Sequence, residues 1–207
     1  METLTLPVEW ASAGRPFPGQ PTSGDACLVR PAPGGALIAV IDGVGHGPEA
    51  TRAARTAVSI LEDHAGESLE ELVRRCHEGL RKTRGVVISL ASAGEASLTW
   101  LGVGNVEGTV VRADPGAKRV QLLLRGGTVG YRLPPLRPET LPMGPGDLLV
   151  LGTDGLKTRF VAEPRPGDVP AALVQRILRF HGRPDDDALV LAARWRAAHQ
   201  PASGSST

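Results

Sequence analysis

Two segments of the chain place an aspartate after a run of apolar residues and directly before a glycine. Residues 36–43 read Ala-Leu-Ile-Ala-Val-Ile-Asp-Gly, and residues 148–155 read Leu-Leu-Val-Leu-Gly-Thr-Asp-Gly. Apolar runs of this length are typical of buried strands. Each strand would hold its carboxylate, Asp42 or Asp154, on a rigid element, and the following glycine would let a backbone carbonyl approach the same point. This pattern suits a metal ion, although Asp-Gly is also a common hairpin turn.

Further carboxylates lie beside two shorter predicted strands. Asp25 precedes a strand at residues 26–29, and three aspartates at residues 185–187 precede a last strand at residues 188–193. A hairpin pairs the start of its first strand with the end of its second, so Asp25 is expected beside Asp42. A run of aspartates alone is more typical of a solvated turn or a helix cap.

If these strand ends converge, their carboxylates repel one another unless cations lie between them. A set of oxygen ligands without His or Cys favours Mg²⁺ or Mn²⁺. Pairs of such ions about 4 Å apart suit phosphoryl transfer because they hold both the phosphate oxygens and an attacking water. The acidic segments therefore indicate phosphate chemistry, provided that the fold brings them together.

The remaining pattern predicts the elements that would position these carboxylates. Helices are predicted at residues 48–63, 68–80 and 171–182; the first has an alanine-rich stripe for packing on a sheet and the second begins with a capping box. Strands are predicted at residues 4–10, 86–90, 98–103, 108–111 and 120–124, and residues 11–23 are predicted to form a loop. Consecutive strands with short turns indicate antiparallel meanders. Gly102-Val103-Gly104 is not followed by a helical pattern, so a dinucleotide site is rejected.

Composition argues against several other classes of function. The 207 residues have a formal net charge of +1, which gives no electrostatic signature of nucleic-acid or membrane binding. No apolar run approaches the ~18 residues of a membrane span, and the N-terminus lacks a signal-peptide pattern. Cys27 and Cys76 have no metal-ligand spacing and are expected to be free thiols. We expect a cytoplasmic protein with a single domain at residues 1–196 and a disordered tail at 197–207.

Several short motifs accompany the acidic segments in a fixed order. They are Ser23-Gly24-Asp25, the segment 41–47 (Ile-Asp-Gly-Val-Gly-His-Gly), Gly104-Asn105, Gly146-Asp147, Thr153-Asp154-Gly155 and Asp186-Asp187. Together they resemble the metal-dependent serine/threonine phosphatases of the PP2C type, in the SpoIIE branch, over residues 24–193. The resemblance implies an α+β fold, a four-layer αββα sandwich of two antiparallel sheets flanked by helices. The metal ions would lie at one edge of the sandwich.

The resemblance also implies metal ligands. Asp42 would bridge two Mn²⁺ or Mg²⁺ ions, and the Gly43 carbonyl would bind one of them. Asp154 and Asp186 would hold the second ion. Leu189 stands where the family has a threonine, so the choice of ligand among the three adjacent aspartates stays open.

The resemblance assigns the chemistry to a hydroxide that bridges the two ions and attacks phosphorus in line. Asp25 would fix a metal-bound water. His46 would be a general acid for the serine leaving group, or it would hydrogen-bond the backbone at the start of the helix. Eukaryotic members bind phosphate with an arginine just before the first aspartate; here Arg15 lies across a predicted loop and receives no such role.

Gly104-Asn105-Val106 and the segment 126–130 are similar to those of stand-alone feedback phosphatases of the stressosome. This resemblance implies phosphoserine and phosphothreonine of STAS-domain stressosome proteins as substrates. One alternative is a phosphatase of a phosphorylated anti-anti-sigma factor. Another is a catalytically silent binding module with the same fold, against which the retained aspartates argue.

Overall fold

Ten strands form two five-stranded sheets in the computed structural model, which describes residues 6–197. One sheet has the order β1 (Val8–Arg15), β10 (Ala188–Trp195), β9 (Leu148–Gly152), β6 (Glu107–Val111) and β7 (Val120–Gln121). The other has the order β2 (Asp25–Ala32), β3 (Gly35–Gly43), β4 (Val86–Ala93), β5 (Ser97–Val103) and β8 (Glu139–Pro142). All named strand pairs are antiparallel.

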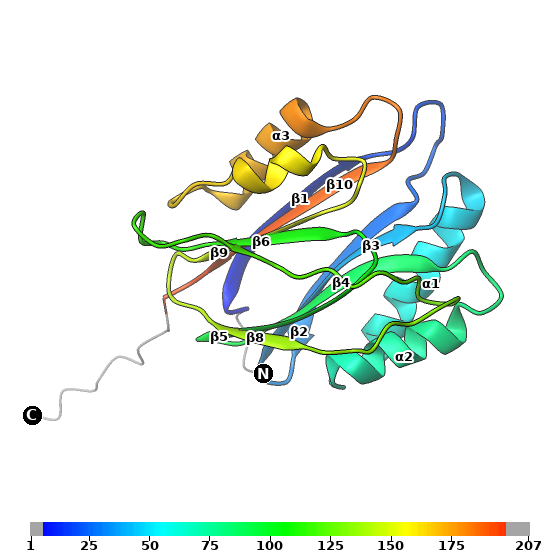
Figure 1. The fold of residues 1–207 in the computed structure, drawn as a ribbon, viewed down its shortest axis with the longest axis horizontal. Coiled ribbons are helices and arrows are strands. Elements are labelled where there is room, and N and C mark those ends of the chain that lie inside the picture. The colour runs from blue at the N-terminus through cyan, green and yellow to red at the C-terminus, as the bar shows by residue number, and fades with distance from the viewer. Residues whose placement is uncertain (1–5, 198–207) are drawn as a thin grey trace, which may run out of the picture.

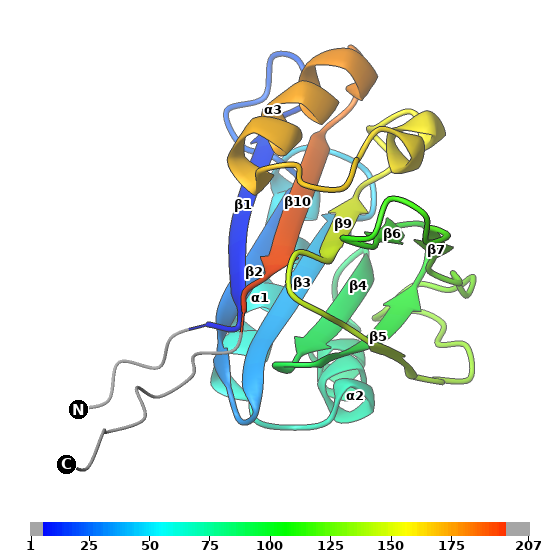
Figure 2. The same ribbon diagram turned by 90° about the vertical axis from the view of Figure 1, so that its left-hand side faces the viewer.

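Helices cover the outer faces of both sheets (Figure 1, Figure 2). The helices α1 (Pro48–Asp63) and α2 (Leu69–Gly79) pack on the sheet that contains β3, and α3 (Pro170–His181) packs on β1 and β10. A 3-10 helix, η1 (Thr158–Ala162), contacts β6 and α3. The expected four-layer sandwich is therefore confirmed. Each helix among residues 6–197 is too short or too polar to cross a membrane.

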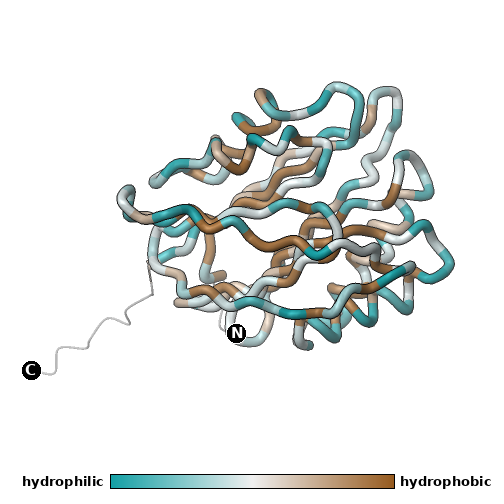
Figure 3. Tube along the Cα trace, in the orientation of Figure 1, coloured by the Kyte–Doolittle hydropathy of each residue, from teal (hydrophilic) through white to brown (hydrophobic). Residues whose placement is uncertain are grey.

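The two long apolar runs are strands buried on both faces. In β3, Leu37 and Ile41 pack among the residues under α1 and α2, whereas Ile38 and Val40 pack between the sheets. In β9, successive side chains likewise alternate between the core under α3 and the core between the sheets. The hydrophobic segments of Figure 3 follow these central strands, and the loops are mostly hydrophilic. Both aspartates that end these runs are therefore carried by strands that are buried on both faces.

The helices begin and end close to the predicted positions. The buried face of α1 is mostly alanine, which allows close packing on β2 and β3. Ser68 caps α2 by accepting a hydrogen bond from the Glu71 backbone N–H at 3.3 Å. This hydrogen bond is one half of the predicted capping box.

Two parts of the predicted secondary structure are wrong. The predicted loop at residues 11–23 begins too early, because β1 continues to Arg15 by pairing with β10. The predicted strand at 120–124 is only Val120–Gln121; the Leu122 N–H still donates to the Gly108 carbonyl of β6, and regular pairing ends there. β8 has no counterpart in the prediction; it is held by its pairing with β5. Most of the predicted tail, residues 198–207, and the first residues of the predicted strand at 4–10 lie outside the described residues.

Candidate active site

The hairpin of β2 and β3 places Asp25 directly opposite Asp42. The hydrogen bond from the Gly43 N–H to the Gly24 carbonyl, 3.1 Å long, closes this end of the hairpin. Directly opposed residues on antiparallel strands have Cβ atoms about 5 Å apart. The two carboxylates are thus held as neighbours by the ladder of the sheet.

Gly43 also determines how closely α1 approaches the end of β3. A Cβ at this position would lie 2.3 Å from the carbonyl oxygen of Ala50, in the first turn of α1. Only glycine avoids that clash, so the residue after Asp42 lets the helix begin beside the acidic strand end. The Gly43 backbone is buried and does not line the adjacent cavity.

Thr153 connects the end of β9 to Asp25 in the other sheet. Its Oγ1 donates to Asp25 Oδ2 at 2.7 Å and accepts from the Leu189 backbone N–H at 2.9 Å. One hydroxyl therefore ties β10 and β2 to the residue that precedes Asp154. This bond brings the ends of strands from both sheets to one place.

A cavity of about 430 Å³ lies where these strand ends meet. Its polar wall consists of Asp42, His46, Asn105, Asp154, Asp185 and Asp186. The carboxylates at the ends of the two apolar strands thus share one cavity although they come from different sheets. Asp25 is next to this group but is not on the cavity wall.

The three adjacent aspartates do not point the same way. Asp185 and Asp186 line the cavity, whereas Asp187 is buried. Asp187 Oδ1 accepts the Phe17 backbone N–H at 2.7 Å, and its Oδ2 has no hydrogen-bond partner among the described residues. Asp187 therefore anchors the segment after β1. Asp185 and Asp186 both remain candidates for a metal ligand.

The cavity concentrates negative charge that no cationic side chain on its wall offsets. Burial, followed by repulsion from Asp25 and by Asp154, raises the pKa of Asp42 to about 9. Burial also raises the pKa of Asp25 to about 7, against the opposing effect of the Thr153 hydrogen bond. The pKa of Asp186 is raised by burial and then by Asp154. No lysine or arginine is among the described residues that line the cavity.

These properties fit a site for hard divalent cations. Crowded carboxylates whose ionised forms are disfavoured gain stability when a cation binds between them. Within residues 6–197, no group of three or more His, Cys, Asp or Glu side chains is arranged so that it could hold a metal ion. Mg²⁺ needs fewer than three protein ligands, since it commonly uses one or two carboxylates and retains several waters.

His46 and Asn105 both line the cavity, but different contacts hold their side chains. The His46 ring stacks on Phe17, with centroids 4.4 Å apart and an interplanar angle of 16°. No hydrogen bond of the His46 side chain is found in the described part of the chain, so the backbone-bonded alternative is not what the structure has. Asn105 Nδ2 donates to Asp154 Oδ2 at 2.7 Å. Sequence reasoning noted the Gly104-Asn105 motif but did not assign this contact, and it missed Phe17 altogether.

Arg15 takes no part in the cavity wall. It ends β1 beside Ala188, and its guanidinium packs against Gly182, where an added Cβ would lie 3.3 Å from Nη2.

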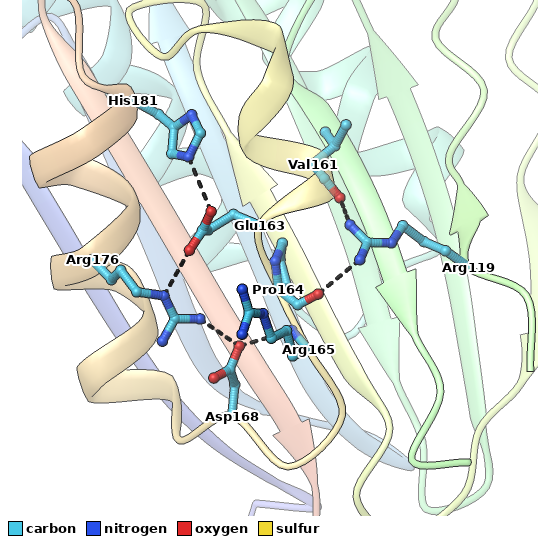
Figure 4. A network of polar contacts seen from close by, with 8 residues as sticks. All are labelled: Arg119, Val161, Glu163, Pro164, Arg165, Asp168, Arg176 and His181. Carbon is cyan, nitrogen blue, oxygen red and sulfur yellow. Dashed lines mark hydrogen bonds and ion pairs between the residues drawn. The ribbon is translucent and has the colours of Figure 1, made fainter. Parts of the chain in front are cut away.

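A polar network fixes the segment that follows Asp154 (Figure 4). Arg176 of α3 donates to Glu163 Oε1 at 2.8 Å and to Asp168 Oδ2 at 2.6 Å. Arg119 adds hydrogen bonds to the carbonyl oxygens of Val161 and Pro164. The chain between β9 and α3 is thereby held to α3 and to the residue before β7, an edge strand of the sheet that contains β9.

The two antiparallel sheets, the flanking helices and the acidic cavity at the strand ends define a PP2C-type phosphatase. The chain belongs to the SpoIIE family: the family model described as Stage II sporulation protein E (SpoIIE) matches residues 32–196.

Among proteins of known name, phosphoserine phosphatase RsbX of Bacillus subtilis (strain 168) is 24% identical to this chain over 140 residues, which is 67% of this chain and 69% of that protein. A solved structure described as "The bacterial stressosome: a modular system that has been adapted to control secondary messenger signaling" is 32% identical in sequence to this chain. It superposes with a TM-score of 0.78 over 90% of this chain and 99% of that one. RsbX in complex with magnesium has a TM-score of 0.81 at 19% identity, over 91% of this chain and 95% of that one.

Proposed function

We propose that this chain is a metal-dependent phosphatase that hydrolyses phosphoserine and phosphothreonine on STAS-domain proteins of a stressosome-like complex. The observation that carries the proposal is the shared cavity of Asp42 and Asp154, which come from different sheets. The similarity to RsbX and to a stressosome structure supports this substrate class. Among the alternatives, phosphorylated anti-anti-sigma factors are the second substrate to test.

Asp42, Asp154 and Asp186 line the cavity and would hold the metal, two Mn²⁺ or Mg²⁺ ions per site. The Gly43 carbonyl, directly after Asp42, would reach an ion only through a shift of this buried backbone. Bound ions would supply a water activated for attack and would neutralise charge on the phosphate. The raised pKa of Asp42 and the absence of a cationic side chain from the described cavity wall support this role. The magnesium complex of RsbX, which has the same fold, supports the choice of ion.

The chain's own residues would divide the remaining work. Asp25, fixed by Thr153, would orient the attacking water by accepting a hydrogen bond from it. Asn105 would keep the Asp154 carboxylate turned into the cavity. As the water oxygen bonds to phosphorus, the bond from phosphorus to the serine oxygen breaks. His46, held on the cavity wall by Phe17, would give that oxygen its proton.

The test is dephosphorylation of separately phosphorylated proteins, with and without Mn²⁺. The wild type is expected to release phosphate from STAS-domain stressosome proteins only when Mn²⁺ is present. Asp154→Ala should reduce the rate by at least about 10². Asp114→Ala, which removes an exposed turn aspartate that does not line the cavity, is the matched control and should retain the wild-type rate.

Other results would contradict either the proposed substrate or the proposed reaction. A preference for a phosphorylated anti-anti-sigma factor would overturn the substrate but keep the reaction. Equal rates for wild type and Asp154→Ala, or hydrolysis that ignores Mn²⁺, would overturn the reaction itself.

A further inference from the structure

A second hollow lies along α1, and most of its lining residues follow His46 of the acidic cavity closely in the sequence. Its volume is about 480 Å³, which is within the range of binding sites. It is lined by Thr22 and by one face of α1: Pro48, Thr51, Arg52, Arg55, Thr56 and Ser59. We call it the α1 groove. Pro48 follows His46 by two residues, so the linings of the groove and of the acidic cavity are adjacent along the chain.

The α1 groove carries two positive charges that the rest of the described chain does not neutralise. Arg52 and Arg55 are exposed, and neither forms an ion pair with a carboxylate of residues 6–197. By contrast, the nearby Arg84 is paired with Glu49 at 2.6 Å. Every other residue that lines the groove is uncharged, so its sign is opposite to that of the acidic cavity.

Hydrogen bonds fix the inner wall of the α1 groove relative to the acidic strands. Thr51 is buried, and its Oγ1 lies 2.8 Å from the Ser23 carbonyl oxygen, to which it donates. The hydroxyls of Thr22 and Thr51 are hydrogen-bonded to each other at 3.1 Å. The first turn of α1 is thereby tied to the segment that leads into Asp25. These hydrogen bonds connect the wall of the groove, through that segment, to the strand that carries Asp25.

We propose that the α1 groove docks an acidic segment of the protein substrate, beside its phosphorylated residue; this inference rests on the proposed phosphatase function. Guanidinium groups bind carboxylates through paired hydrogen bonds, and the groove's hydroxyls match a peptide's polar groups. The carboxylates of the cavity would repel an acidic segment, so the favourable contacts of that segment must lie outside the cavity. Two arginines on a chain of net charge +1 give too small a positive field for nucleic acid.

Binding of unphosphorylated peptides tests the groove independently of catalysis. The probes are two short fluorescent peptides with a central serine, one flanked by glutamates and the other by glutamines, measured by fluorescence anisotropy. The wild type is expected to bind the acidic peptide roughly tenfold more tightly. Arg52→Glu/Arg55→Glu, and the milder Arg52→Gln/Arg55→Gln, should remove this preference. Lys118→Glu/Arg179→Glu makes the same change in net charge elsewhere on the molecule and should retain it.

Hydrolysis separates failure of the groove from failure of the proposed function. The phosphoserine forms of both peptides and p-nitrophenyl phosphate are compared in the presence of Mn²⁺. The arginine variants should lose the preference in kcat/KM for the acidic phosphopeptide and hydrolyse p-nitrophenyl phosphate at the wild-type rate. Equal binding of both peptides by the wild type, or a preference that survives in folded arginine variants, overturns the groove. A wild type that binds the acidic peptide selectively but hydrolyses none of these substrates overturns the phosphatase function and leaves the groove as an acidic-peptide site.

Discussion

Thr153 Oγ1 donates to Asp25 Oδ2 at 2.7 Å, and this single hydrogen bond joins the two sheets at the edge where the carboxylates gather. The same hydroxyl accepts the Leu189 backbone N–H at 2.9 Å. Removing it would therefore leave two buried groups without a partner. The bond also opposes the rise in the pKa of Asp25 that burial causes.

Thr153→Val is expected to lower the free energy of unfolding by about 1–3 kcal/mol, because it leaves the Leu189 N–H and Asp25 unsatisfied. Urea unfolding measures this change. Thr153→Ser keeps the hydroxyl and should cost less than about 1 kcal/mol. Wild-type stability of Thr153→Val would contradict this role of the hydroxyl, because valine keeps the shape of the side chain and removes only the hydrogen bonds of Oγ1.

Gly43→Ala should destabilise the fold by about 1–3 kcal/mol, because the new Cβ would lie 2.3 Å from the backbone oxygen of Ala50. The control is Gly126→Ala, since nothing lies within 4 Å of a Cβ at Gly126. Comparison of the urea midpoints of both variants with that of the wild type gives the result. An unchanged midpoint for Gly43→Ala would contradict the close approach of α1 to β3.

The stability of the metal-free protein should decrease as pH rises from about 4 to about 9. The pKa of Asp42 is raised from 3.8 to about 9 and that of Asp25 to about 7. Below pH 3.8 both carboxyls are protonated in the folded and unfolded chains, and no penalty arises. Above it the unfolded chain ionises first, so unfolding becomes more favourable until the folded-state pKa is passed.

Thermal unfolding in a chelator at pH 5, 7 and 9 tests this pH dependence. Asp42→Asn removes one of the titrating groups and should give a flatter profile than the wild type. Mn²⁺ should raise the Tm most at the highest pH, where the folded carboxylates are ionised. A metal-free Tm that increases over this range would show that the carboxylates are not crowded as described.

The polar network between α3 and the segment that precedes it should contribute to stability through Arg176, which pairs with Glu163 and Asp168. Arg176→Ala is expected to lower the free energy of unfolding by about 1 kcal/mol, since its partners are partly exposed. Arg179→Ala, on the same helix but exposed, should have little effect. Chemical unfolding at two salt concentrations would show whether the loss is electrostatic, because salt screens such pairs.

Local pattern was sufficient to predict much of this fold. The unbroken apolar runs in β3 and β9 follow from their burial on two faces, which leaves no polar alternation. Asp25 lies opposite Asp42 because a short turn joins their strands, and that turn can be recognised in the sequence. The last residues of β1, in contrast, are defined by pairing with β10 far along the chain. Ser12 and Gly14 give no local signal for a strand there.

Side-chain direction explains most of what the sequence did not predict in the site. Asp185 and Asp186 line the cavity while Asp187 turns into the core, and three identical neighbours give no signal for that division. Phe17 stacks on His46, and its backbone is held by Asp187, which is distant in the sequence. The hydrogen bond from Asn105 to Asp154 likewise depends on strands that only the folded chain brings together.

Calorimetric titration of the metal-free protein with Mn²⁺ tests the central claim most directly. The wild type should bind Mn²⁺, and Asp42→Asn and Asp154→Asn should each weaken binding at least about tenfold, because the two carboxylates would serve one centre. Wild-type affinity in both variants, or no binding by the wild type, would contradict the account.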